Sequence, residues 1–139
     1  MANLDIRWLA GFFDGEGSFA IQRHNTGHQV CIYVCNTNMA IMDLIEAQFP
    51  GNKRNTNANS KKFSNRKRCD VIWWRGETAI KLAARMLPHL QVKQGQARCV
   101  VDYPLWKASG PGITLPKSIY KKREQLLQIA KKLNKRGIK

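Results

Sequence analysis

The chain has 139 residues, of which 43% are hydrophobic, so it is long enough and apolar enough to bury a core. Its 24 lysines and arginines face nine acidic residues, and the formal net charge of +15 calls for a polyanionic partner. No window approaches the roughly 18 apolar residues of a membrane span and no signal peptide opens the chain, so we expect an intracellular protein without a transmembrane helix.

The first half of the chain predicts a helix, a β-hairpin and a second helix. Residues 4–15 place apolar side chains at helical spacing, and glycines follow directly. Residues 18–25 and 28–36 alternate in polarity as two strands do, with a turn between them. Asn38 is a suitable N-cap for the second helix, which we expect to stop at Pro50.

The second half predicts another β unit followed by helices. Residues 52–66 are polar and basic, and their composition allows either a disordered loop or a solvated hairpin that becomes ordered on a ligand. Residues 69–75 have the character of a strand. Helical patterns follow at 77–87, 93–107 and, with a basic outer face, 117–136. The order predicts an α+β fold, in which helices cover one face of an antiparallel sheet and leave the other face free.

Four cysteines are spread along the chain without a CxxC pair. A zinc site needs closely paired ligands, so the pattern does not favour zinc. In an intracellular protein we expect these cysteines to be reduced and partly buried thiols.

The most specific stretch for function is residues 8–19, where two acids stand in a basic chain. Gly11 and Gly15 lie on one face of the predicted helix, where each glycine costs about 1 kcal/mol relative to alanine. Two copies packed through these glycines would bring two Glu16 carboxylates together, and a hard divalent cation would relieve their repulsion. An ordinary helix with a glycine-rich end explains the spacing equally well, and Asp14 is typical of a helix-end or packing residue.

Residues 9–17, LAGFFDGEG, resemble the LAGLIDADG signature of the homing endonucleases. The similarity extends to 36–38 and to 87–97, LPHLQVKQGQA, and so spans about residues 4–105. It implies the αββαββα fold of that family, with a saddle-shaped sheet. The endonuclease core would occupy 1–107 and a basic C-terminal helical extension 108–139.

The resemblance also implies roles for individual residues. Glu16 would bind the metal together with the backbone carbonyl of Gly15. Lys93 would support the attacking water or the developing charge on the phosphate. A polar residue at the end of the second strand would organise solvent, and of Cys35 and Asn36 the latter is the better candidate. The expected cofactor is Mg²⁺, and Mn²⁺ or Ca²⁺ can replace it in binding.

Two basic regions carry most of the charge, with eight lysines and arginines in 53–75 and nine in 117–139. Nucleic acid explains this charge best, because phosphate contacts are rewarded by counterion release. An anionic membrane surface and a ribosomal type of RNA are alternatives. In the family the sheet lies along the major groove of double-stranded DNA, and its outward residues here would be Gln22, His24, Gln29, Lys53, Arg54, Arg66, Arg68 and Arg75.

One copy of the motif implies a homodimer, with an interface formed by Trp8, Gly11, Phe12 and Gly15. Its DNA target would be pseudo-palindromic and cut once in each strand. The predicted function is therefore that of a site-specific double-strand endonuclease in intron homing. Alternatives are an RNA maturase that binds its own intron RNA, a DNA-binding protein of the same fold that does not cleave, and a membrane-surface protein built on 117–136.

Overall fold

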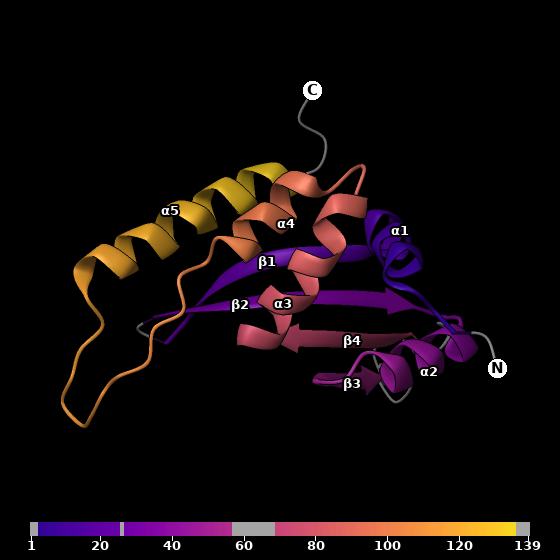
Figure 1. The fold of residues 1–139 in the computed structure, drawn as a ribbon, viewed down its shortest axis with the longest axis horizontal. Helices are drawn as coiled ribbons and strands as arrows, with labels where there is room; N and C mark the ends of the chain where they lie inside the picture. The colour runs from indigo at the N-terminus through magenta and orange to yellow at the C-terminus, as the bar shows by residue number, and fades with distance from the viewer. Residues whose placement is uncertain (1–2, 26, 57–68, 136–139) are drawn as a thin grey trace, which may run out of the picture.

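The computed structural model describes residues 3–25, 27–56 and 69–135. A 3₁₀ turn, η2, lies at Leu87–His89 between the third and fourth helices. The helices and strands in chain order are α1 (Ile6–Glu16), β1 (Gly17–His24), β2 (Gly27–Asn36), α2 (Met39–Gln48), β3 (Asn52–Thr56), β4 (Asp70–Arg75), α3 (Gly76–Met86), α4 (Gln94–Val101) and α5 (Lys117–Asn134) (Figure 1). This order confirms the predicted α+β arrangement.

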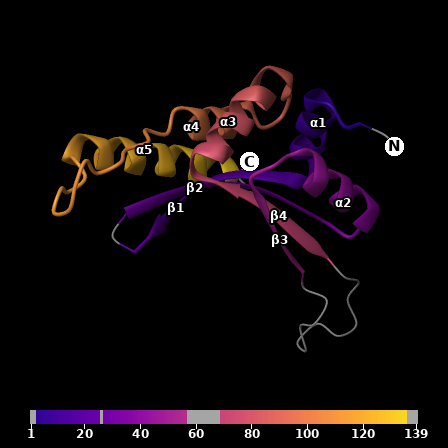
Figure 2. The ribbon, with the colours of Figure 1, turned by 60° about the horizontal axis from the view of Figure 1, so that its bottom comes forward.

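The sheet has four strands in the order β1-β2-β4-β3, and every neighbouring pair is antiparallel. The helices lie on one side of it, and the β1–β2 hairpin and the β3–β4 pair slope away on either side of the centre (Figure 2). No helix of the described ranges covers the opposite face, which we call the open face. The predicted saddle with one uncovered face is confirmed.

Alternation along the strands decides which side chains enter the core. Phe19, Ile32 and Trp74 have no exposed surface and face the helices, since every second residue of a strand points to the same side. The ring of Phe13 on α1 lies 5.3 Å from that of Phe19 and 5.8 Å from that of Trp74, measured between centroids. Leu127 of α5 is buried in the same core, so the C-terminal helix packs with the rest.

Asp5 and Gly17 determine where helix α1 begins and ends. The carboxylate of Asp5 caps it by accepting a 2.8 Å hydrogen bond from the Trp8 backbone N–H. It runs to Glu16, and a Cβ atom at Gly17 would collide with the side chain and the backbone of Phe13. Only glycine therefore lets the chain pass so tightly from α1 into β1.

Three expectations need correction or limits. The helix predicted over 93–107 ends at Val101, because Pro104 lacks a backbone N–H and restricts the residue before it. The expectation of reduced thiols is wrong for Cys35 and Cys69, which form a disulfide with Cα atoms 6.6 Å apart. In the basic region, 52–56 is a strand, while 57–68 lies outside the described residues.

The register of the sheet explains the disulfide. Cys35 pairs with Val71, so Cys69 occupies the diagonal position on the same face of the sheet. Sequence spacing alone does not reveal that register. Cys31 and Cys99 are free and buried, as expected of thiols that take part in packing.

Candidate functional site

The C-terminal end of α1 presents two of the predicted metal ligands to solvent. Gly15 and Glu16 are both exposed. Within 3–25, 27–56 and 69–135, no hydrogen bond or ion pair engages the Glu16 carboxylate. The last carbonyls of a helix also lack donors within the helix, so this end offers both a carboxylate and backbone oxygens.

The other acid of the motif, Asp14, binds the loop that contains residues 91–93. The carboxylate of Asp14 accepts hydrogen bonds from the backbone N–H groups of Gln91, Val92 and Lys93, at 2.7, 3.0 and 3.0 Å. These residues lead into α4. The prediction that Asp14 is a packing residue is confirmed, because it joins α1 to the segment that carries Lys93.

The Lys93 side chain reaches the same end of α1. Its Nζ donates to the carbonyl of Phe13 at 3.2 Å and to that of Gly17 at 2.5 Å. A cation at the carbonyl end of a helix is favoured by the helix dipole. The structure thus brings Lys93 to the turn that contains Glu16, from 76 residues away along the chain.

A hollow beside Lys93 adds residues that sequence reasoning missed. It has a volume of about 410 Å³ and opens between β1, β2, α4 and the last turn of α5. Its polar lining consists of Ser18, Tyr33, Lys93, Gln96, Asn134 and Lys135. The α5 residues follow α1 by more than a hundred positions, so no local spacing relates them to the motif.

Asn36 is the last residue of β2, which is the position that the resemblance implies for a polar residue. Its Oδ1 accepts a 2.8 Å hydrogen bond from the Asn38 backbone N–H, which shapes the turn into α2. It pairs with the buried Asp70, on the helix-covered side of the sheet. Its alternative, Cys35, alternates to the open face but is bonded to Cys69.

Most of the predicted DNA-contacting residues in the described part of the chain share the open face. Gln22 pairs with Gln29 across the hairpin, and both alternate with core residues. His24, Lys53 and Arg75 have the same orientation by the register of their strands. Two further predictions, Arg66 and Arg68, lie outside the described residues.

An aromatic residue that the sequence did not single out lies between these basic ones. Trp73 stands opposite both Tyr33 and Lys53 in the sheet. The guanidinium carbon of Arg75 lies 5.3 Å from the centre of its ring. The middle of the open face therefore combines rings with cationic side chains.

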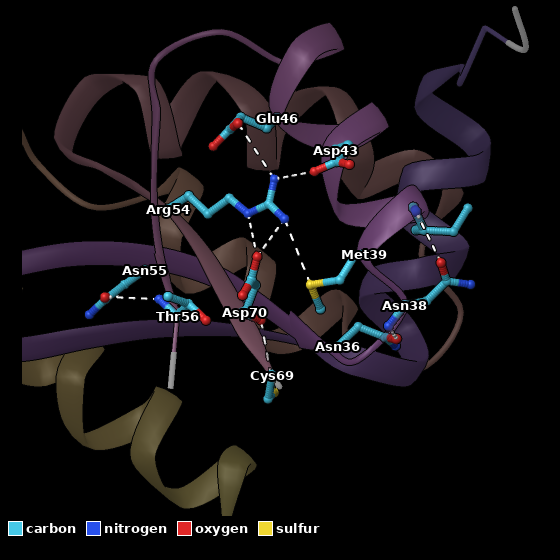
Figure 3. A network of polar contacts seen from close by, with 11 residues as sticks. Asn36, Asn38, Met39, Asp43, Glu46, Arg54, Asn55, Thr56, Cys69 and Asp70 are labelled. Carbon is cyan, nitrogen blue, oxygen red and sulfur yellow. Dashed lines mark hydrogen bonds and ion pairs between the residues drawn. The ribbon is translucent and has the colours of Figure 1, made fainter. Parts of the chain in front are cut away.

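The expectation that Arg54 points outward is wrong. It pairs with the buried Ile72 and so faces the helices, where its side chain is only 16% exposed. Figure 3 shows its guanidinium between α2 and β4: it donates at 2.6 Å to Asp43 and at 2.6 Å to Asp70. The hydrogen bond to Asp43 and, to a smaller extent, the one to Asp70 raise the pKa of Arg54 above its usual value.

The four predicted interface residues lie on one outer face of α1. The rings of Trp8 and Phe12 are stacked with centroids 5.1 Å apart. A Cβ atom added at Gly11 or Gly15 would meet nothing within 4 Å. Packing within the described chain therefore gives no reason for these two glycines, and this face remains available to another helix.

In residues 3–25, 27–56 and 69–135, no cluster of three or more His, Cys, Asp or Glu could hold a metal ion. A single chain thus brings one exposed acid, Glu16, to the end of α1. None of the helices described is both long and apolar enough to cross a bilayer.

Solved structures reveal what this geometry is similar to. No protein-family model and no curated protein matches the sequence. The homing endonuclease I-CvuI, in complex with its target in the presence of 2 mM Ca, matches with a TM-score of 0.67 at 16% identity, over 96% of this chain and 83% of its own. The archaeal intron-encoded homing endonuclease I-Vdi141I, complexed with DNA, matches with a TM-score of 0.66 at 14% identity, over 96% and 86%.

A third structure carries the family's name. The LAGLIDADG homing endonuclease I-GzeII, in complex with its DNA target, matches with a TM-score of 0.53 at 17% identity, over 72% of this chain and 35% of its own. This chain has the LAGLIDADG homing endonuclease fold.

The likeness is not confined to the motif. Because the match to I-CvuI spans 96% of the chain, it extends into 108–139, the part for which the sequence resemblance is least diagnostic. Within this chain, helix α5 packs on the common core through Leu126, Leu127 and Ala130.

Proposed function

We propose that this chain is a site-specific double-strand DNA endonuclease that acts as a homodimer with a divalent metal ion. The observation that carries the proposal is the placement of Glu16 and Lys93 at one end of α1, in a molecule whose sheet leaves a basic, amide-rich face open. The net charge of +15 suits a polyanion as large as a DNA duplex. The matched structure of I-CvuI is a complex with its target, and that of I-Vdi141I is a complex with DNA.

The proposed dimer is inferred from the residues on the outer face of α1. Stacked rings and two glycines on one face of α1 allow a second α1 to approach closely. Such packing would place the two Glu16 carboxylates near a two-fold axis. The DNA target should then have approximate two-fold symmetry, with one half-site for each subunit.

The residues at the α1 end suit a hard divalent cation. Glu16 offers an exposed carboxylate and Gly15 a backbone carbonyl, and such oxygens are the ligands that Mg²⁺ and Ca²⁺ prefer. I-CvuI has been crystallised with DNA in 2 mM Ca and, with the DNA uncleaved, in 2 mM Mg. When bound, the metal would supply Lewis-acid stabilisation of the phosphate charge.

The chain's own side chains would position the DNA strand. Lys93 is held at the helix end by Asp14 and by two carbonyls, so its positive charge is preorganised beside the Glu16 turn. Asn36 would order solvent through its Nδ2 group and the second lone pair of Oδ1, whose first is used in the turn to α2. Gln22, His24, Gln29, Lys53 and Arg75 would contact bases and phosphates from the open face.

The first prediction tests Glu16. We expect Glu16→Gln to keep DNA binding and to lose cleavage by at least about a hundredfold, because a neutral amide is a poor ligand for a hard cation. A randomised duplex library incubated with the protein in Mg²⁺ yields the cleaved target, and gel shift and cleavage assays on that target then compare the two proteins.

The matched control is Glu77→Gln, which removes the same charge from an exposed position on α3, where Glu77 forms an ion pair with Lys81. It should cleave like the wild type. Undiminished cleavage by Glu16→Gln would overturn the assignment of the site.

A further inference from the structure

Glu124 is the one acid in the basic segment 117–139, and it is bonded on several sides. Its carboxylate accepts hydrogen bonds from Nε and Nη2 of Arg23, at 3.1 and 2.6 Å. His28 contributes Nε2 at 2.9 Å, and Gln128 contributes Nε2 at 2.9 Å. Because a carboxylate only accepts, the proton of the His28 ring must lie on Nε2.

These contacts stay in place at neutral pH. The bond from Arg23, and then that from His28, lower the pKa of Glu124 to about 2, so the carboxylate is ionised. The side chain of His28 has no exposed surface, and its ring meets the edge of Tyr120 with centroids 4.8 Å apart. Two side chains of α5, Tyr120 and Glu124, therefore contact the His28 ring.

The two bonded residues of the hairpin are partners in the β ladder. Arg23 of β1 stands opposite His28 of β2, so both side chains point to the α5 side. The neighbouring pair, Gln22 and Gln29, points to the open face by alternation. The position of the Arg23–His28 pair therefore affects the orientation of the neighbouring Gln22–Gln29 pair.

This end of the hairpin has no other support from the sheet. Strand β2 pairs with β4 only from Cys31 to Asn36, so residues 21–24 and 27–30 pair in the sheet only with each other. An isolated two-stranded hairpin is marginally stable in water. The orientation of its end therefore depends on contacts outside the sheet, among them those of Arg23 and His28 with Glu124 of α5.

A second anchor fixes α5 along β1. Asn134 donates a 3.0 Å hydrogen bond to the Phe19 carbonyl, and Leu133 lies 3.0 Å from the position of a Cβ on Gly95. Ten residues of helix span about 15 Å and four residues of strand about 13 Å. The distance from Glu124 to Asn134 therefore matches that from Arg23 to Phe19, and α5 braces the edge strand at two points.

We propose that Glu124 is a positioning residue for DNA recognition, which holds the Arg23–His28 pair against α5 and thereby sets where Gln22, His24 and Gln29 meet the DNA. This inference rests on the proposed function. The contact of Glu124 with Arg23 and His28, which we call the clamp, lies about 23 Å from Glu16 along the strand at about 3.3 Å per residue, so it acts on recognition and not on the cleavage centre.

Electrostatics alone gives the opposite expectation, which makes the test decisive. Removing an acid from a chain of charge +15 should strengthen its attraction to DNA. If Glu124 positions the hairpin, Glu124→Gln must instead weaken specific binding. The readout is a selection of binding sequences from a randomised duplex library in Ca²⁺, followed by titration of the selected duplex.

For Glu124→Gln we expect base preference to be lost at the pairs farthest from the symmetry axis and kept at the inner pairs. Affinity for the selected duplex should fall about tenfold or more, as for the loss of one or two base contacts. Glu77→Gln, with the same change in charge, should keep the wild-type profile. An unchanged profile or tighter specific binding by Glu124→Gln would overturn the proposal.

Arg23→Lys keeps the charge and serves if Glu124→Gln unfolds. Lysine cannot form the bidentate contact with Glu124, so the protein should lose its preference at the same outer base pairs without any change in net charge. If the wild type selects no sequence at all, the proposed function fails and this inference fails with it. If the wild type selects a site and both variants select it equally well, only the clamp is refuted.

Discussion

Two acids in LAGFFDGEG have different tasks because their surroundings differ. The Asp14 carboxylate accepts three backbone N–H groups, whereas Glu16 two residues later is exposed and has no bonded partner in the described part of the chain. Asp14 thereby delivers Lys93 to the helix end at which Glu16 stands. The proposed metal-binding role and the support of the helix end thus belong to two different acids of the motif.

Asp14→Asn should lower the free energy of unfolding by about 2 kcal/mol, because an amide offers one acceptor oxygen and no charge to the three N–H groups. Cleavage should fall as well, since Lys93 loses its support. Urea unfolding followed by circular dichroism measures the stability. Asp102→Asn at the exposed C-cap of α4 is the control, with an expected change within about 0.5 kcal/mol. Equal stability of the two variants would contradict this role.

Between elements, Arg54 ties α2 to the sheet. Its guanidinium bonds Asp43 on α2 and Asp70 on β4, and Glu46 lies 3.5 Å from it. Asp70 is completely buried, so its charge needs compensation inside the protein. The contact sets α2 against β3 and β4.

Arg54→Met should destabilise the protein by about 3 kcal/mol, because it leaves a buried carboxylate without its guanidinium. Lys53→Met is a matched control, since the neighbouring residue carries the same charge on the opposite face of β3. We expect that control to keep its stability and to weaken DNA binding instead. Thermal unfolding and gel shift separate the two effects, and similar melting temperatures for both variants would argue against the network.

For the whole molecule, folding and assembly impose different demands on α1. Its inner face carries the buried residues Leu9, Ala10 and Phe13, and its outer face carries glycines at which an added Cβ atom would meet nothing within 4 Å. Glycine in a helix lowers the stability of the monomer. A dimer that packs through this face would explain why such residues are found there.

Gly11→Ala should therefore stabilise the monomer by up to about 1 kcal/mol and weaken self-association. Unfolding at low protein concentration measures the first effect, and sedimentation equilibrium measures the second. A variant that gains stability and still dimerises as the wild type does would remove α1 from the interface. A monomeric wild type, with or without DNA, would refute the dimer itself.

Local patterns in the sequence determined much of this protein. Apolar periodicity and glycines at element ends predicted α1, the β1–β2 hairpin and α3 closely, because these features act over a few residues. The motif resemblance singled out Glu16 and Lys93. Alternation also predicted the open face of the hairpin, since its apolar residues mark the buried side.

Only the tertiary structure decided the rest. Residues 52–56, NKRNT, contain no apolar residue, so nothing in them marks which side of β3 faces the core, and the inward position of Arg54 does not follow from the sequence. The Cys35–Cys69 bond depends on the β2–β4 register. The contacts of Asp14 with 91–93 and of Glu124 with Arg23 join residues 77 to 101 positions apart. Such pairs are set by how elements pack, and packing depends on the whole core at once.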